Sequence, residues 1–414
     1  MTLEQAKEKL GQYGQEHVLR YYEQLPEDQK RALLEQVERA DLSILRNVGH
    51  RPARPGFAEP AQRGIITPLE VMTLSEIEEN REALEREGLE TIRQGAVGAV
   101  LLAGGMGTRL GSEEPKGTYP IGISRNLSIF ECIFHNLLDV VRRASAWIHL
   151  FVMTSDKNHE ETVRFLSQHG FFGYDRGHVH FFKQEMAVST DYDGKIYMEE
   201  KWKMASSPNG NGGWYRSLKK SGLVKLVAAE GIEWFNVFAV DNVLQRIADP
   251  VFIGAVLRKG AAVGSKVVSK NAPDEKIGVM CLEDGKPSII EYYELTEELM
   301  NAKDGQGEPA YRYGVILNYL FRRAGLEELE KSELPLHLVE KKIPYLDETG
   351  EKVRPERANG YKYENLVLDM IHQMDSCLPF EVARGREFAP VKNLTGADSV
   401  DTARALLLEN GITL

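Results

Sequence analysis

The feature that most constrains the fold of this chain is a glycine-rich turn directly after a short apolar segment. Residues 97–103 (VGAVLLA) form a short, apolar, partly β-branched run, which is the pattern of a buried strand. The chain then continues as GGMGTRLG to Gly111. Glycine accepts positive φ and lets bare backbone approach a ligand. The pattern therefore indicates a ligand site at the end of a buried strand.

Strands and helices are predicted to alternate after this turn, which indicates an α/β fold with a largely parallel sheet. Strands are predicted at residues 148–154, 179–182 and 234–240, and helices at residues 129–144 and 159–169. Three further strands follow with little helix between them, at residues 261–268, 278–282 and 288–292. These three suggest a more antiparallel extension of the same sheet.

The length of 414 residues allows roughly two or three domains. We expect a helical N-terminal region over residues 1–95, an α/β catalytic domain over 96–334 and a small C-terminal domain over 335–414. Smaller features are a loop at 51–56, a helix at 363–374, a strand at 380–383 and a closing helix after Ser399.

Charge and cysteine content exclude several classes of protein. The net charge of −11 argues against a general nucleic-acid or anionic-membrane binder. Cys132, Cys281 and Cys377 are far apart and form no CxxC, as in proteins of a reducing compartment. The N-terminus has no apolar signal core, and no stretch approaches the ~20 apolar residues of a membrane span. We therefore expect a cytoplasmic protein with no nucleic-acid or membrane partner, whose oligomeric state the sequence does not indicate.

The glycine-rich turn has the composition of a polyphosphate site. Successive backbone amides in such a turn form an anion-binding nest, and Arg109 and Lys116 add two cations beside it. Three ligand-binding interpretations compete, beside a glycine-rich turn that binds nothing. A dinucleotide fold expects an acidic residue about 20 residues further on, and residues 123–128 contain none. A Walker A loop requires G-x-x-x-x-G-K-[ST], which is absent. A nucleotidyltransferase turn accounts for the glycines and both cations together.

The run from Leu102 to Gly111, followed by Pro115, Lys116 and Gly117, resembles the signature of the UDP-sugar pyrophosphorylases. Within that family it is most similar to the UDP-N-acetylglucosamine pyrophosphorylase branch, and the resemblance runs from about residue 97 to the C-terminus. Further similar blocks lie at residues 153–156, 181–184, 208–213, 240–242, 266–268, 291–292, 341–345, 359–360 and 390–393. The resemblance implies a GT-A-like, Rossmann-type nucleotidyltransferase with a mixed central sheet, a helical N-terminal layer and a small C-terminal domain.

The resemblance also implies a reaction in which a sugar 1-phosphate attacks UTP and pyrophosphate leaves. Arg109 and Lys116 would hold the triphosphate, and Lys392 would steady the incoming sugar phosphate. Asp241 follows a predicted strand, where α/β sheets place ligand chemistry, and would be the ligand of Mg²⁺. The substrate-binding residues implied are Leu102, Gly104, Gly105, Gln184, Gly210, Asn211, Gly278, Glu291 and Tyr292. Lys266 is interpreted as structural.

Several positions depart from the family pattern on the sugar side. Val315 replaces an asparagine, Glu185 replaces a glycine, and Leu366 and Leu368 replace aromatic residues of the animal members. The expected sugar is N-acetylglucosamine or N-acetylgalactosamine 1-phosphate, with glucose 1-phosphate second and galactose 1-phosphate also open. A non-catalytic nucleotide-sugar binder and an NAD(P)-binding protein are the alternatives from other classes.

Overall fold

The computed structural model describes residues 1–49 and 63–414, so the loop predicted at 51–56 lies outside the described residues. Contacts divide the chain into two compact units. Unit 1 comprises residues 1–62, 185–213 and 334–367, and unit 2 comprises residues 63–184, 214–333 and 368–414. These units do not follow the division at residues 95 and 334, because each is assembled from three separate stretches of chain.

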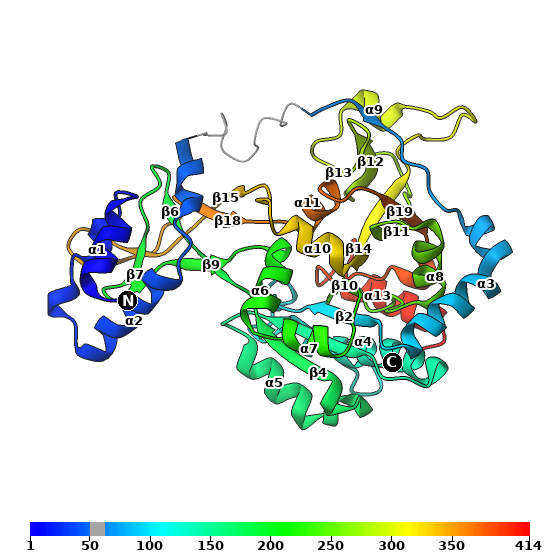
Figure 1. Cartoon of the computed structure of the whole chain (residues 1–414), viewed down its shortest axis with the longest axis horizontal. Coiled ribbons are helices and arrows are strands. Elements are labelled where there is room, and N and C mark those ends of the chain that lie inside the picture. Colours follow the sequence, from blue (N-terminus) through cyan, green and yellow to red (C-terminus); the bar gives the residue numbers. More distant parts are fainter. Residues whose placement is uncertain (50–62) are drawn as a thin grey trace. The chain divides into compact units, whose positions relative to one another are not determined.

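Unit 2 is built on a ten-stranded mixed sheet, and its parallel part holds the first four predicted strands (Figure 1). Strand β2 (Val97–Leu102) lies between β10 (Trp234–Ala239) and β3 (His149–Thr154), and β4 (Val179–Lys183) follows β3. All three pairings are parallel. Every residue of β2 is buried, as expected for a strand covered on both faces.

The other part of the sheet is mostly antiparallel, as predicted. Strand β14 (Tyr313–Arg322) pairs antiparallel with β10, β11 and β12, so it joins the two parts. Only β19 runs parallel to its neighbour, β11. The remaining strands of this part are β1 (Ile66–Thr67), β11 (Val263–Ser269), β12 (Val279–Glu283), β13 (Lys286–Ile290) and β19 (Cys377–Glu381).

Helices pack against the sheet of unit 2 and complete its core. Helix α3 (Leu74–Arg93) lies against α8 (Pro250–Lys259) at very close range. A Cβ on Gly88 would lie 1.9 Å from the Pro250 carbonyl oxygen, so only glycine permits this crossing. The other helices are α4 (Ile129–Ala144), α5 (His159–Gln168), α6 (Trp214–Lys220), α7 (Val224–Ala229), α9 (Glu297–Asn301), α10 (Arg323–Leu329), α12 (Arg384–Glu387) and α13 (Val400–Glu409).

Unit 1 has its own apolar core, formed by helices and short strands. Helices α1 (Leu3–Gly11) and α2 (Glu27–Arg39) bury Leu10, Leu33 and Val37. A three-stranded sheet contains β15 (His337–Lys341), β18 (Gly360–Glu364) and β6 (Thr190–Asp191). The short pairs are β5 (Met186–Val188) with β9 (Ser206–Pro208), β7 (Met198–Glu200) with β8 (Lys203–Met204), and β16 (Tyr345–Leu346) with β17 (Lys352–Val353).

Two predicted elements of the C-terminal stretch are corrected. The helix predicted over 363–374 is wrong at its start, because β18 ends at Glu364 and α11 covers only Val367–His372. The strand predicted at 380–383 is shifted, because β19 ends at Glu381. The closing helix is confirmed as α13, with Ser399 as its N-cap.

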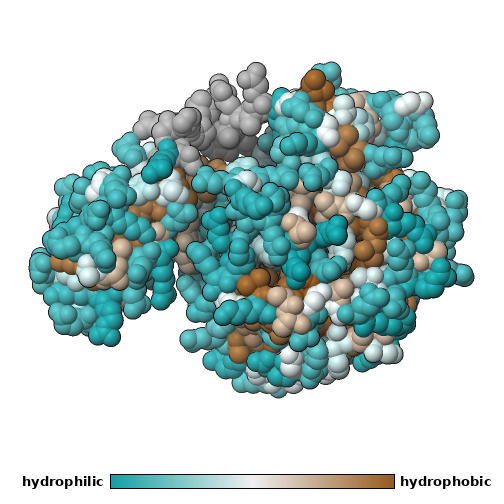
Figure 2. Space-filling model, in the orientation of Figure 1, coloured by the Kyte–Doolittle hydropathy of each residue, from teal (hydrophilic) through white to brown (hydrophobic). Residues whose placement is uncertain are grey.

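The surface in view is mainly hydrophilic, with apolar residues in small patches (Figure 2). Within the described part of the chain, every helix is too short or too polar to cross a membrane.

Candidate active site

One edge of the unit 2 sheet collects most of the predicted site residues. The parallel strands β2, β3, β4 and β10 all end at this edge, with Leu102 aligned to Met153 and Ala239. Strand β14 begins at the same edge, because it runs antiparallel to β10 with Asn318 opposite Phe238. Ligands of α/β sheets bind at the carboxyl ends of parallel strands. The topology therefore builds the candidate site here.

The glycine-rich turn leaves β2 and is held in shape by its own backbone. The Lys116 amide donates to the Gly105 carbonyl at 3.1 Å, and the Gly107 amide donates to the Glu114 carbonyl at 2.9 Å. The turn thus folds back on itself and brings Lys116 beside the glycines. A Cβ on Gly105 would meet nothing within 4 Å, so open space remains on that side of the turn.

Asn158, the residue before α5, holds the turn by hydrogen bonds, and the sequence analysis missed it. Its side chain is fully buried and donates to the carbonyls of Ala103 at 2.8 Å and Gly105 at 3.2 Å. Its Oδ1 accepts from the Ser155 amide at 2.8 Å. The one signal in the sequence is an asparagine directly before the predicted helix, which by itself indicates only a cap.

Four predicted charged residues meet beside the turn. Lys116 Nζ lies 3.6 Å from Asp241 Oδ2, and these side chains are 16% and 23% exposed. Burial lowers the pKa of Lys116, Asp241 opposes that effect, and the nearby cations Lys392 and Arg109 lower the pKa further. Asp398 pairs with Lys392, so these three cations face two carboxylates and the group keeps one excess positive charge.

The segments that carry Asp241 and Lys392 are joined by backbone hydrogen bonds. The Val391 amide donates to the Asp241 carbonyl at 2.8 Å. Lys392 Nζ donates to Asp398 Oδ2 at 3.0 Å, and the Lys392 amide donates to the Asp398 carbonyl at 2.7 Å. These contacts fix Lys392 on the Asp241 side of the site, although the two residues lie 151 positions apart in the sequence.

Gln184 lies against the same turn from the end of β4. The backbone amide of Gln184 donates to the Thr154 carbonyl at 2.7 Å, and the residue is 7% exposed. A Cβ on Gly104 would lie 2.9 Å from Gln184 Oε1. Leu102 ends β2 with its carbonyl accepting from the Val240 amide at 3.2 Å, so it shapes the floor of the turn.

The resemblance implies that this turn binds UTP, and replacing Gly104 with alanine should then weaken that binding more than it weakens the fold. The added methyl group would press on Gln184 Oε1, and the Gln184 side chain would have to move. We expect KM for UTP to rise about tenfold, which corresponds to about 1.4 kcal/mol. Gly305→Ala, whose Cβ would also meet no protein atom within 4 Å and which lies outside the glycine-rich turn, is the control and should leave KM for UTP unchanged.

A second cluster of predicted residues lies where β12, β13 and β14 meet. The Val315 amide donates to the Gly278 carbonyl at 2.8 Å. A Cβ on Gly278 would lie 3.5 Å from Val315 Cγ2 and 3.6 Å from Glu291 Cδ. Tyr292 is 41% exposed, and its ring packs edge-on against Tyr293. The structure thus groups Gly278, Glu291 and Val315, as a shared pocket requires.

The last two predicted residues belong to unit 1. Gly210 has φ +87°, and a Cβ there would lie 2.2 Å from the Asn365 carbonyl oxygen. Asn211 Oδ1 accepts from the Val367 amide at 2.9 Å. Both residues therefore help to hold the stretch that contains Leu366.

A metal at this site would depend on very few protein ligands. In residues 1–49 and 63–414, no group of three or more His, Cys, Asp or Glu side chains is arranged to hold a metal ion. Mg²⁺ suits such a site, because it prefers one or two carboxylates together with phosphate oxygens and water. The lone Asp241 carboxylate beside a cationic turn fits that donor set.

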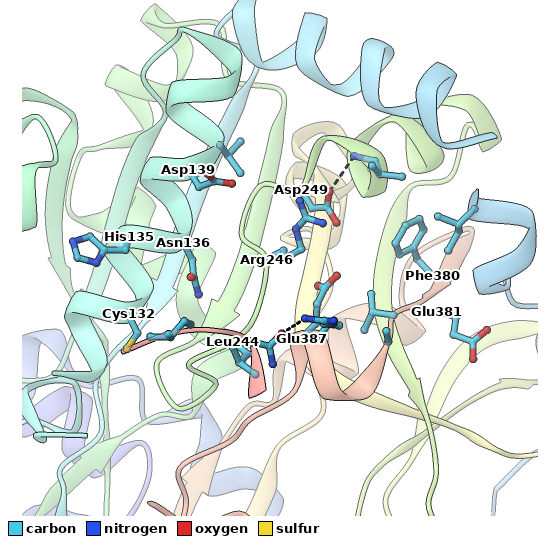
Figure 3. A pocket seen from close by; sticks show the side chains of 18 of the residues that line it. Cys132, His135, Asn136, Asp139, Leu244, Arg246, Asp249, Phe380, Glu381 and Glu387 are labelled. Atoms are coloured by element: carbon cyan, nitrogen blue, oxygen red, sulfur yellow. Dashed lines mark hydrogen bonds between the residues drawn. The ribbon is translucent and has the colours of Figure 1, made fainter. Parts of the chain in front are cut away.

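A cavity of about 570 Å³ lies in unit 2, and none of the predicted site residues lines it (Figure 3). Its walls include residues of α3, α4 and α12, together with Arg246 and Asp249.

The fold and the cationic turn define a class of protein, the nucleotidyltransferases of GT-A-like, Rossmann type. The same fold is found in the UDP-N-acetylglucosamine pyrophosphorylase from Trypanosoma brucei solved with an inhibitor, with a TM-score of 0.81 and 27% identity over 97% of this chain and 83% of that chain. The model of the UTP–glucose-1-phosphate uridylyltransferase family matches residues 62–409. The chain belongs to this family.

Two relatives resemble almost the whole chain. The UDP-N-acetylhexosamine pyrophosphorylase-like protein 1 of Homo sapiens is 35% identical, over 97% of this chain and 83% of its own length. The UDP-N-acetylglucosamine diphosphorylase 2 of Arabidopsis thaliana is 36% identical, over 97% of this chain and 82% of its own length. The predicted family and fold class are confirmed.

Proposed function

We propose that this protein is a uridylyltransferase that forms a UDP-sugar and pyrophosphate from UTP and a sugar 1-phosphate. The observation that carries the proposal is the pair of Lys116 and Asp241 beside the glycine turn, with Arg109 and Lys392 close enough to affect the Lys116 pKa. A protein that only bound a nucleotide sugar would need no such excess of cations where pyrophosphate leaves. The names of the relatives support the same reaction.

The proposed reaction is a displacement at the α-phosphorus of UTP. An oxygen of the sugar 1-phosphate forms the new bond to that phosphorus, and the bond to the bridging oxygen of pyrophosphate breaks. Negative charge grows on the leaving pyrophosphate, so Arg109 and Lys116 would lower the barrier by neutralising it. Lys392 would hold the sugar phosphate in line for attack.

We propose Mg²⁺ as the cofactor, with Asp241 as its protein ligand. When bound, the ion supplies positive charge to the phosphate oxygens. Asp241 is suited to this role because it already faces the phosphate-binding cation Lys116.

Uridine recognition is assigned to the turn and to Gln184, whose amide offers the donor and the acceptor that an imide base requires. Gly104 and Gly105 would let backbone approach the nucleotide, and Leu102 would shape the floor. We propose Gly210 and Asn211 as substrate-binding residues of unit 1. The sugar would be bound by Gly278, Glu291 and Tyr292.

We propose N-acetylglucosamine or N-acetylgalactosamine 1-phosphate as the first choice of sugar and glucose 1-phosphate as the second. The relatives named above support the N-acetylhexosamines, whereas Val315 leaves the choice among sugars open. A cytoplasmic location is proposed from the three unpaired cysteines.

The experiment that tests the function is pyrophosphate release from UTP and Mg²⁺ with four sugar 1-phosphates in parallel. N-acetylglucosamine, N-acetylgalactosamine, glucose and galactose 1-phosphates are the substrates to compare. Release with one of the two N-acetylhexosamines is the expected result. If no pyrophosphate is released with any of the four sugar phosphates although UTP binds, a non-catalytic nucleotide-sugar binder is favoured. Binding of NAD(P) without binding of UTP would favour the dinucleotide fold.

Val315→Asn should change the choice of sugar without changing the use of UTP. The asparagine amide would add a donor and an acceptor beside Gly278 and Glu291, and one hydrogen bond is worth about 1 kcal/mol. We therefore expect kcat/KM for the preferred N-acetylhexosamine 1-phosphate to rise severalfold relative to glucose 1-phosphate, with KM for UTP unchanged. An unchanged ratio would remove Val315 from the proposed sugar pocket.

A further inference from the structure

A fully buried lysine lies in the middle of strand β11. Lys266 is 0% exposed, and its Nζ donates to Glu387 Oε2 at 2.6 Å, to Asp249 Oδ2 at 3.0 Å and to the Arg246 carbonyl at 3.2 Å. Both carboxylates are buried. Clusters of buried charge are costly and add little net stability, although removing one member is strongly destabilising. The arrangement therefore calls for a role besides stability.

Lys266 joins the two segments that lead to the phosphate site. Residues 246–249 follow Asp241 along the chain, and Glu387 in α12 precedes Lys392. The Lys266 ammonium group binds both segments at once. Asp249 and Glu387 lie on the wall of the cavity beside Arg246 (Figure 3).

The same two segments are tied together again next to the site. Asn242 Nδ2 donates to the Glu387 carbonyl at 2.7 Å, and Asn242 Oδ1 accepts from the Ala389 amide at 2.9 Å. The Val391 amide donates to the Asp241 carbonyl at 2.8 Å. Glu387 thus takes part in both ties, through its side chain to Lys266 and through its backbone to Asn242. A shift of Glu387 would be transmitted to the segments of Asp241 and Lys392.

The charge of Lys266 determines how its two partners ionise. Burial alone would raise the pKa of Asp249, but attraction to Lys266 and Arg246, together with the hydrogen bonds from Lys266 and the Val251 amide, lowers it. Burial raises the pKa of Glu387, Lys266 opposes the rise, and the nearby Asp249 charge adds to it. Arg246 lowers the pKa of both carboxyl groups. Lys266 therefore favours the charged form of both carboxyl groups.

We propose that Lys266 is a positioning residue for the phosphate site, holding the segment of Asp241 and the segment of Lys392 at a fixed separation. The inference rests on the proposed function, since it concerns residues assigned there to Mg²⁺ and to the sugar phosphate. Displacements of about 1 Å in such sites can cost about 10²-fold in rate, so a distant tether can control turnover.

Lys266→Met, which keeps the length of the side chain and removes its charge, tests the proposal. We expect kcat to fall about 10- to 100-fold. Calorimetry should show weaker binding of UTP with Mg²⁺ than in the wild type. Tyr174→Phe is the control for lost stability alone, because the buried Tyr174 hydroxyl donates to the Ile148 carbonyl at 2.5 Å, at the start of β3 and away from the site edge. This variant should lower Tm and leave both kcat and UTP binding unchanged.

A double variant separates positioning from simple charge balance. Lys266→Met with Asp249→Asn removes the unpaired charge at residue 249, and asparagine still caps α8. Burial raises the pKa of Glu387, so this carboxyl group can take up a proton and Tm should recover in part. The tether from β11 to Glu387 remains cut, so kcat and UTP binding should stay low. Recovery of kcat together with Tm would overturn the proposal, as would unchanged kcat and UTP binding in Lys266→Met. A wild-type protein that bound UTP with Mg²⁺ but formed no UDP-sugar would refute the proposed function instead, and the calorimetric comparison would still decide the role of Lys266.

Discussion

Lys116→Ala is expected to lower the turnover of UTP by a factor of about 10²–10³ while the fold stays intact. Lys116 is the partly buried cation closest to Asp241, and it is held beside the glycine turn by its own amide. Without it, the charge that develops on pyrophosphate would lose one of the cations proposed to neutralise it. The measurement is kcat for pyrophosphate release, with circular dichroism and Tm to confirm folding.

The pH dependence offers a second readout of the same residue. Burial lowers the pKa of Lys116, and Asp241 only partly offsets that effect. Because Lys116 must be protonated to act, kcat/KM should fall at high pH earlier than an ordinary lysine would require. This alkaline limb should be absent in Lys116→Ala. Arg109→Ala should lose a similar share of turnover, whereas Lys259→Ala, an exposed lysine at the end of α8, should be normal. Retained activity in both Lys116→Ala and Arg109→Ala would remove the phosphate-site assignment.

Asp241→Asn is expected to abolish Mg²⁺-dependent turnover. The substitution preserves the size of the side chain but removes its negative charge, so it loses the proposed ligand and the partner of Lys116. Removal of that charge should also lower the Lys116 pKa further, because Asp241 acts to raise it. Calorimetry should show UTP binding that no longer strengthens when Mg²⁺ is added.

The control for Asp241 is Asp139→Asn, which alters an exposed carboxylate on α4. It should leave both turnover and the Mg²⁺ effect on UTP binding unchanged. Full Mg²⁺-dependent activity in Asp241→Asn would place the metal at another residue.

The parallel part of the sheet could be predicted almost completely from the sequence. Strands β2, β3 and β10 are short apolar runs bounded by polar or glycine-rich stretches, and burial on both faces makes such runs easy to recognise. Strand β4 is only partly buried, and its valine and phenylalanine residues mark it as a strand. Helix α4 was predicted with its observed bounds, because its apolar residues repeat at helical spacing and Ser128 caps it.

Other elements could not be predicted from local patterns. Strand β14 runs directly into α10, so no glycine or proline separates the two elements. The predicted helix over 363–374 takes in the end of β18, although the buried Tyr361 and Tyr363 alternate with the less buried Lys362 in the manner of a strand. Local spacing alone did not decide between the two periods over so few residues.

The charged residues of the candidate site could be proposed from the sequence, but the residues that hold them in place by hydrogen bonds could not. Arg109, Lys116 and Asp241 stand out because charges follow a glycine turn or end a strand. Asn158 does not, because its importance lies in hydrogen bonds to Ala103 and Gly105, more than 50 positions earlier. Hydrogen bonds between residues so far apart in the sequence form only in the folded chain, so the sequence does not show which polar residue holds the turn.

The residues proposed to bind the nucleotide and those proposed to bind the sugar lie in different parts of the mixed sheet, and this separation bears on how sugar specificity could evolve. The residues proposed to handle the nucleotide are mostly at the ends of parallel strands, whereas Gly278, Glu291 and Val315 lie in the antiparallel part. Strand β14 is the neighbour that connects the two parts, through its pairing with β10. Under the proposed assignment, substitutions near the hairpin of β12 and β13 would change the choice of sugar more than the use of UTP. A lineage built on this plan can diversify its acceptors while its donor stays the same.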